Sequence, residues 1–156
     1  MSVFKNSFSV AANVIPSDDV NIPFPNNVLS GTNTSVTANA LVDSSADFVT
    51  SGIKVGDTVL NNANLIYAYV IAVFPTYLEL SNDIFVSSGV SYSIFQGENN
   101  GCYIYVGDTS TGSNLEVETI GGNVLIFYGV LVGQVLPVQV RKVLTTSTAG
   151  KLIALW

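Results

Sequence analysis

The apolar residues of this chain come in short runs, and no segment repeats them every 3.6 positions as an amphipathic helix would. The runs are rich in Val, Ile, Tyr and Phe and are bounded by Gly, Pro, Asn and Asp, which is the pattern of strands and turns. Gly121-Gly122 lies between two such runs and permits the positive φ angles of a tight hairpin turn. The sequence therefore predicts an all-β fold without long helices.

The strand pattern also predicts two domains, one inserted into the other. Residues 34–96 contain a complete set of short strands and predict a small β-barrel. Residues 1–33 are too few to form a sheet alone, so we expect them to join residues 97–156 in a β-sandwich-like or jelly-roll-like domain. Insertion at a surface loop costs little when the inserted ends are close together. Two domains in simple series are the alternative.

Charged residues are scarce and hydrophobic residues abundant. Only 10% of the 156 residues are charged, against roughly 25% in an ordinary soluble domain. Hydrophobic residues make up 48%, and the mean hydropathy is +0.47. Since an extensive apolar surface marks a contact site, we expect neighbouring subunits to cover part of this one, as in a homo-oligomer. The apolar run 124–140 contains glycines, a glutamine and a proline, so we interpret it as strands and expect no membrane span.

The five basic residues are scattered and the net charge is −6, which argues against a nucleic-acid partner. The chain has no histidine and one cysteine, Cys102, so no zinc-ligand spacing and no intrachain disulfide exist. Catalysis by a nucleophile usually needs a histidine base. The acidic pairs near residues 18–21 and 43–47 are typical of turns and helix caps more than of calcium loops. We therefore expect no cofactor and no metal.

One carboxylate arrangement leaves an enzymatic alternative open. Glu116 and Glu118 lie two apart on a predicted strand and so share a face, and Asp108 is the nearest further carboxylate in sequence. A glycosidase needs two carboxylates flanking the scissile bond. Charges that protect a strand edge from aggregation explain the pair more simply. The interpretation that we prefer is a protein that is not an enzyme.

Aromatic residues on predicted strands are the candidate contact residues. Tyrosine suits both strands and interfaces, and a terminal Trp after three aliphatic residues indicates a docked last strand. An aromatic platform for a glycan, with the loops 107–114 and 144–150 as tips, is the alternative interpretation. The candidate interface residues are Tyr67, Tyr69, Tyr103, Tyr105, Tyr128 and Trp156.

Three stretches together resemble small virion structural proteins of bacteriophages. They are "NVIPSDDVNIPFP" near the start, "LVDSSADFVTSGIKVGDTVLN" with "LELSNDIF" in the middle, and the ending "VLPVQVRKVLTTSTAGKLIALW", which "GCYIYVGDTSTGSNLEVETIGGNVLIFYGV" precedes. The ending is the most specific of them. The middle stretch is similar to a small β-barrel module that recurs in phage structural proteins. These are patterns of strands and turns, so the resemblance transfers no functional residues.

The resemblance implies residence in a virus particle, assembled in the host cytoplasm. The implied roles are capsid decoration, a penton or vertex component, or a spike or fibre base. The implied partners are other virion proteins, either the major capsid protein or spike and fibre subunits. A receptor- or glycan-binding module of a spike or fibre is the alternative function.

Overall fold

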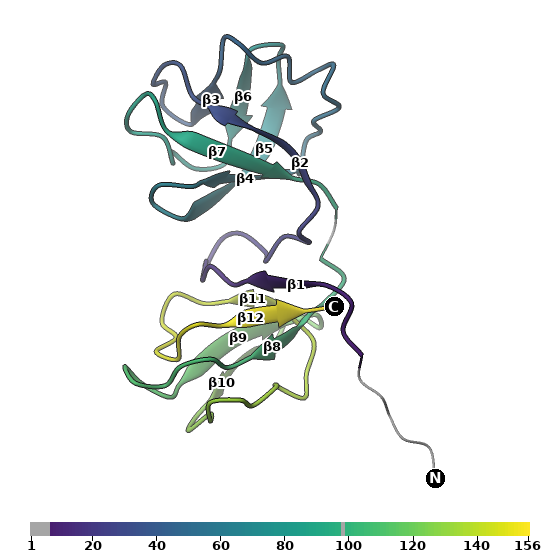
Figure 1. Ribbon diagram of the computed structural model, residues 1–156, viewed down its shortest axis with the longest axis vertical. Helices are drawn as coiled ribbons and strands as arrows, with labels where there is room; N and C mark the ends of the chain where they lie inside the picture. The colour runs from purple at the N-terminus through teal and green to yellow at the C-terminus, as the bar shows by residue number, and fades with distance from the viewer. Residues whose placement is uncertain (1–6, 98) are drawn as a thin grey trace. The chain divides into compact units, whose positions relative to one another are not determined.

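The computed structural model describes residues 7–97 and 99–156, which form strands and turns but no helix (Figure 1). The predicted all-β fold is confirmed. No helix in the described residues has the length and apolar character needed to cross a bilayer. The strands are β1 (Ala11–Asn13), β2 (Asn27–Thr32), β3 (Ala40–Val42), β4 (Thr58–Asn61), β5 (Ile66–Val73), β6 (Tyr77–Leu80), β7 (Ser91–Phe95), β8 (Tyr103–Tyr105), β9 (Leu115–Thr119), β10 (Val124–Phe127), β11 (Val140–Val143) and β12 (Ile153–Leu155).

The chain divides into two compact units, and one interrupts the other in sequence. Unit 1 consists of Met1–Asp18 and Asn99–Trp156, and unit 2 is Asp19–Glu98. The expected inserted segment began at residue 34, whereas unit 2 begins fifteen residues earlier. The difference is due to β2, which pairs antiparallel with β7 from Asn27↔Phe95 to Thr32↔Ser91. The two prolines before β2 and the pair Asn26-Asn27 at its start had indicated a loop there.

Unit 2 is one antiparallel sheet in the order β2-β7-β4-β5-β6-β3. Its edge strands, β2 and β3, do not pair with each other. A single bridge between Ser35 and Val42 joins the segment after β2 to β3. The prediction of a small barrel is therefore wrong, because the sheet of unit 2 is open and not closed. One hydrophobic core serves the unit, built from Leu41, Phe48, Ile53, Val59, Ala68, Val70, Leu78, Leu80, Ile84, Phe85, Tyr92 and Ile94.

Unit 1 contains two three-stranded antiparallel sheets, in the orders β1-β12-β8 and β10-β9-β11. Single bridges, Cys102↔Val140 and Tyr105↔Val135, connect the β8 region to the segment leading into β11. The strands β8, β9 and β12 bury alternate residues, as strands with one face toward a core do. The buried positions include Ile104, Leu115, Val117, Val140, Val143 and Ala154. A jelly roll has eight strands in two Greek keys, so that part of the expectation is not confirmed.

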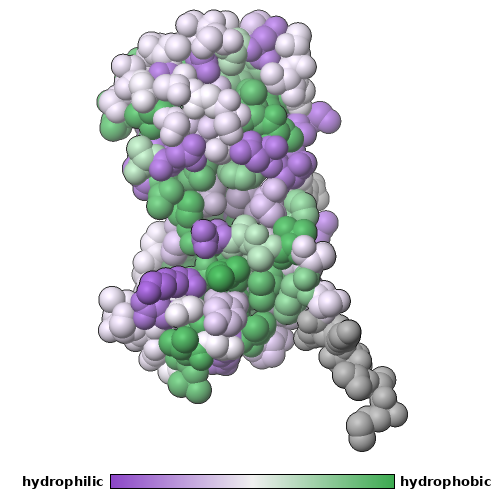
Figure 2. Space-filling model, viewed as in Figure 1, coloured by the Kyte–Doolittle hydropathy of each residue, from purple (hydrophilic) through white to green (hydrophobic). Residues whose placement is uncertain are grey.

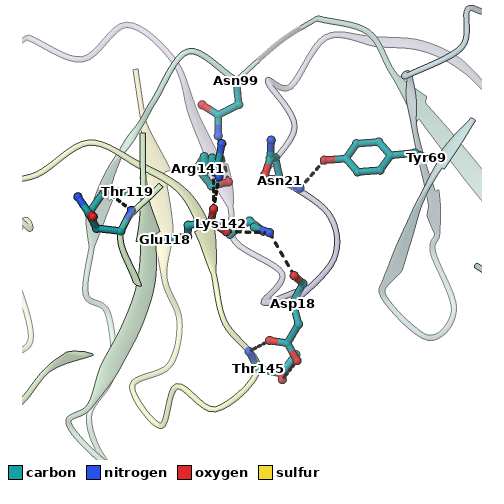
Figure 3. A network of polar contacts seen from close by, with 10 residues as sticks. Asp18, Asn21, Tyr69, Asn99, Glu118, Thr119, Arg141, Lys142 and Thr145 are labelled. Carbon is teal, nitrogen blue, oxygen red and sulfur yellow. Dashed lines mark hydrogen bonds and ion pairs between the residues drawn. The ribbon is translucent and has the colours of Figure 1, made fainter. Parts of the chain in front are cut away.

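Both points where the chain leaves unit 1 are bound to β11 or the residues just after it (Figure 3). At the first, the carboxylate of Asp18 accepts hydrogen bonds from the amide and hydroxyl of Thr145, at 2.9 and 2.6 Å. Lys142 Nζ also donates to the Asp18 carbonyl, at 3.2 Å. At the second, Asn99 Nδ2 donates to the Arg141 carbonyl, at 3.5 Å. Because both ends are held at one strand, unit 2 is inserted at little cost in chain entropy.

Candidate functional site

Unit 1 carries an exposed run of apolar residues along β10 and the loop that follows it. We call this run the apolar strip. Its residues are Val124, Leu125, Ile126, Tyr128, Leu131, Val132 and Val135. Figure 2 colours each residue by its hydropathy, and hydrophobic residues (green) are visible on the face that it shows. Together these side chains expose on the order of 600 Å², an area comparable to that of the largest apolar patch on a typical monomer.

The strand β10 is unusual because residues on both of its faces are exposed. It lies at the edge of its sheet and pairs only with β9, from Val124↔Glu118 to Phe127↔Leu115. Antiparallel sheets normally direct apolar residues to the core and polar residues to solvent. Here Val124 and Ile126 lie on the same face as the glutamates of β9, yet they are apolar. The strand thus resembles a buried one in sequence but is open to solvent in the isolated chain.

The loop after β10 holds the rest of the strip in a fixed position. The Gln134 amide donates to the Leu131 carbonyl at 3.0 Å, which closes a four-residue turn. Gly133 occupies the third position of that turn with φ 88°, a conformation that favours glycine. The Gly133 amide donates to the Val106 carbonyl at 2.8 Å, which anchors the turn to the core. Leu131, 70% exposed, and Val132 therefore project from an ordered tip.

The predicted tyrosines of unit 2 are occupied inside that unit. Tyr67 is only 6% exposed, and burial raises the pKa of its hydroxyl to about 12. Tyr69 is half-buried, and its hydroxyl oxygen accepts a hydrogen bond from the Asn21 amide at 2.7 Å (Figure 3). Tyr67 thus presents almost no surface to a partner or a sugar ring.

The predicted aromatic residues of unit 1 differ among themselves. Tyr103 and Tyr105 are half-buried, and the ring of Tyr103 lies against Phe8 with the centroids 5.6 Å apart. Trp156 is half-buried, and its Nε1 donates to Asn99 Oδ1 at 3.4 Å. Tyr128, in contrast, is 73% exposed and directly follows β10. Of the six predicted residues, Tyr128 is therefore the one that belongs to the apolar strip.

The two glutamates of β9 share a face as predicted, but both are engaged. Glu118 Oε2 is 2.8 Å from Lys142 Nζ, and Glu118 Oε1 accepts a 2.9 Å hydrogen bond from Arg141 Nε (Figure 3). These bonds, with Lys142 first, hold the pKa of Glu118 below its usual 4.5. Glu116 accepts a hydrogen bond from the Thr146 hydroxyl. A glycosidase general acid needs a raised pKa, and that of Glu118 is displaced in the opposite direction.

The remaining acidic candidates also have protein partners. Asp108 forms an ion pair with Lys151 at 3.3 Å. Asp43 is buried and accepts hydrogen bonds from Ser45 and Tyr92, at 2.6 and 2.8 Å. Within residues 7–97 and 99–156, no three side chains of the His, Cys, Asp and Glu types lie together as a metal site requires.

Most of the strip was missed by reasoning from sequence. The run Val124–Phe127 has no alternation of apolar and polar residues, and such a run is typical of a strand buried on both faces. A pattern of residue types does not reveal which strand lies at the edge of a sheet. The glycines on either side, at 121, 122, 129 and 133, are the one signal that this segment lies between exposed turns.

Comparison of the chain with protein-family models, with curated proteins and with solved structures found no match.

Proposed function

We propose that this protein is a non-enzymatic structural component of a bacteriophage virion that acts through contacts between subunits. The observation that carries the proposal is the apolar strip of unit 1, which is extensive, ordered and uncharged. Apolar and aromatic side chains form the central part of protein interfaces, where charged residues are depleted. Such a surface gains free energy when it is buried against another protein.

The order of the strip supports a binding role. Leu131 and Val132 are presented by a turn whose backbone is hydrogen-bonded to the core. A partner that covers them does not have to immobilise a mobile loop, and that cost otherwise reduces affinity. In an assembly with many copies, avidity multiplies the modest affinity of each contact.

The virion context rests on the resemblance of the three sequence stretches to phage structural proteins. The scarcity of charge agrees with it, because a subunit that is covered in a particle needs fewer charges for solubility. The partners that we propose are further copies of the chain and other virion proteins, such as the major capsid protein or spike and fibre subunits.

Incorporation of the chain into particles tests this proposal. Particles would be produced with the wild-type chain or with Leu131→Lys, purified, and their proteins quantified by mass spectrometry. The matched control is Val86→Lys, which adds the same charge at a residue that is 78% exposed in unit 2. We expect wild type and Val86→Lys at the same stoichiometric copy number and Leu131→Lys strongly depleted. Absence of the wild-type chain from intact particles, or equal incorporation of all three chains, would contradict the proposal.

A further inference from the structure

The open edge of β10 has unpaired backbone groups at two defined residues. The Thr119 amide donates to the Asn123 carbonyl at 2.9 Å, so Thr119 and Asn123 form a hydrogen-bonded pair of the hairpin. Such pairs alternate along an antiparallel ladder. Leu125 and Phe127 therefore direct their N–H and C=O groups toward β9, and Val124 and Ile126 direct theirs away from it.

The opposite side of β9 supports this assignment. The Glu116 carbonyl accepts a hydrogen bond from the Leu144 amide at 2.9 Å, beyond the end of β11. Glu116 is the partner of Ile126 in the register of β9 and β10. Its backbone faces β11, as the alternation requires, so the pair Glu116–Ile126 is not hydrogen-bonded. Ile126 thus offers a free donor and a free acceptor at the edge.

The two edges of this sheet differ in how they are protected from other strands. The edge strand β11 carries Arg141 and Lys142, and its register with β9 is irregular between residues 140 and 142. Charged side chains and bulges are the usual protection of an edge. The described residues of β10 include no charge, no proline and no bulge in its pairing with β9. An edge of this kind is a template for another strand.

We propose that β10 pairs antiparallel with β10 of a second copy of this chain, around a two-fold axis at Leu125. This inference rests on the proposed function and names one of its contacts. In that register Val124 lies opposite Ile126 of the second copy, and the reverse, so the outward groups of both residues form four backbone hydrogen bonds. Leu125 lies opposite its own counterpart. The two sheets then become one continuous sheet of six strands.

The side chains of β10 fit this partner. A two-fold interface must be complementary to itself, and the three central pairs in this register are aliphatic against aliphatic. Apolar cross-strand pairs are favourable, whereas like charges placed opposite each other are not. Val124, Leu125 and Ile126 are 53%, 45% and 43% exposed, so their side chains are available for these cross-strand pairs.

The acidic character of the chain does not prevent the pairing. The nearest carboxylates of the sheet, Glu116 and Glu118, lie on β9 and so are three strand spacings from their counterparts, or roughly 14 Å. This separation exceeds the Debye length of about 8 Å at physiological ionic strength. Glu118 is in addition compensated by Arg141 and Lys142. Charge repulsion across the proposed axis is therefore weak.

Charge complementation at position 125 tests the pairing and its register. Sedimentation velocity would give the mass of the full chain for wild type, Leu125→Lys, Leu125→Glu and an equimolar mixture of the two variants, with Val86→Lys as the control. Circular dichroism and thermal unfolding would show that each variant is folded. We expect wild type and Val86→Lys to dimerise, each single variant to dimerise at least tenfold more weakly, and the mixture to recover dimer.

The possible outcomes separate this inference from the proposed function. Folded Lys and Glu variants that dimerise as well as wild type would overturn the β10 pairing but leave assembly through another surface. A wild-type chain that is monomeric in solution yet present in particles would also overturn the pairing, and would indicate a different virion protein as the occupant.

As a second variant, Ile126→Pro removes an outward N–H without removing a hydrogen bond to β9, so it should weaken the dimer while unit 1 stays folded.

Discussion

Replacing Tyr92 by Phe should measure the buried hydrogen bond that joins β7 to the loop after β3. Tyr92 is 1% exposed in the core of unit 2, where its ring lies 6.2 Å from that of Phe48. Its hydroxyl donates to Asp43 Oδ2 at 2.8 Å. The substitution leaves the ring in place and removes one hydrogen bond to a charged group, a loss of about 1.5–3 kcal/mol. We therefore expect unit 2 to unfold roughly 6–24 °C lower than in wild type, for a domain of its size.

The pH dependence of this loss follows from Asp43. Burial alone would raise the pKa of Asp43, but hydrogen bonds from Ser45 and Tyr92, together with backbone amides, outweigh it and hold the pKa below 3.8. A carboxyl group whose pKa is lowered by folding contributes stability above its unfolded pKa, and loses that contribution as the pH falls through the folded value. The difference between Tyr92→Phe and wild type should therefore be complete at pH 7 and shrink below about pH 4.

Urea unfolding between pH 7 and pH 3 would measure the stability difference between Tyr92→Phe and wild type. Calorimetry would give the difference in melting temperature. The matched control is Tyr67→Phe, which removes the hydroxyl of another buried tyrosine of the same sheet; no hydrogen bond to a carboxylate is present at that hydroxyl in the described part of the chain. We expect the control to lose much less stability. A loss below about 0.5 kcal/mol for Tyr92→Phe, or one that stays constant to pH 3, would refute the reasoning.

Three further predictions concern unit 1. Burial raises the pKa of the Cys102 thiol to about 12, so the folded chain should not react with a thiol reagent at neutral pH, while urea-unfolded chain should react fully; fast reaction of the folded chain would contradict this. Deleting Leu152–Trp156 removes β12, the central strand of its sheet. Unit 1 should then lose its protection from proteolysis, and the chain should no longer assemble. A truncated chain whose unit 1 still resists proteolysis would contradict the central position of β12. Glu118→Gln weakens the contacts with Arg141 and Lys142 and should cost about 1 kcal/mol at neutral pH. Because folding lowers the pKa of Glu118, the stability cost of Glu118→Gln should disappear as the pH falls below 4.5. A cost that is the same at pH 3 as at neutral pH would contradict this prediction.

The parts of the fold that could be predicted are those with a strong local cause. The glycine pair at 121–122 predicted the hairpin, and Gly122 has φ 85° in the turn between β9 and β10. The segment Tyr77–Leu80 follows a proline turn and alternates cleanly, and it forms β6. In contrast, β2 contains Asn27 and Gly31, residue types that are depleted in strands, and pairing with β7 over a separation of about sixty residues stabilises it. Long-range pairing of this kind has no local signal.

The sequence predicted that the candidate site would be an apolar surface, but it did not predict which strand would carry that surface. Scarcity of charge predicted an extensive apolar surface, and the structure exposes apolar side chains along the apolar strip. That other subunits cover this surface stays a prediction. The tyrosines were selected for residue type, yet the position of each strand in its sheet decides exposure. Tyr67 lies on a central strand and is buried, whereas Tyr128 follows an edge strand and is exposed. Strand order arises from the whole chain, so a local pattern did not identify β10.

Hydrogen–deuterium exchange along residues 120–135 of the full chain, measured at low and at high protein concentration, tests the central claim most directly. If another subunit covers the apolar strip, exchange at the Val124 and Ile126 amides should slow as the chain associates, while exchange in the exposed loops of unit 2 stays constant. Exchange at both amides that remains fast in the associated chain would contradict the claim that this edge is where subunits meet.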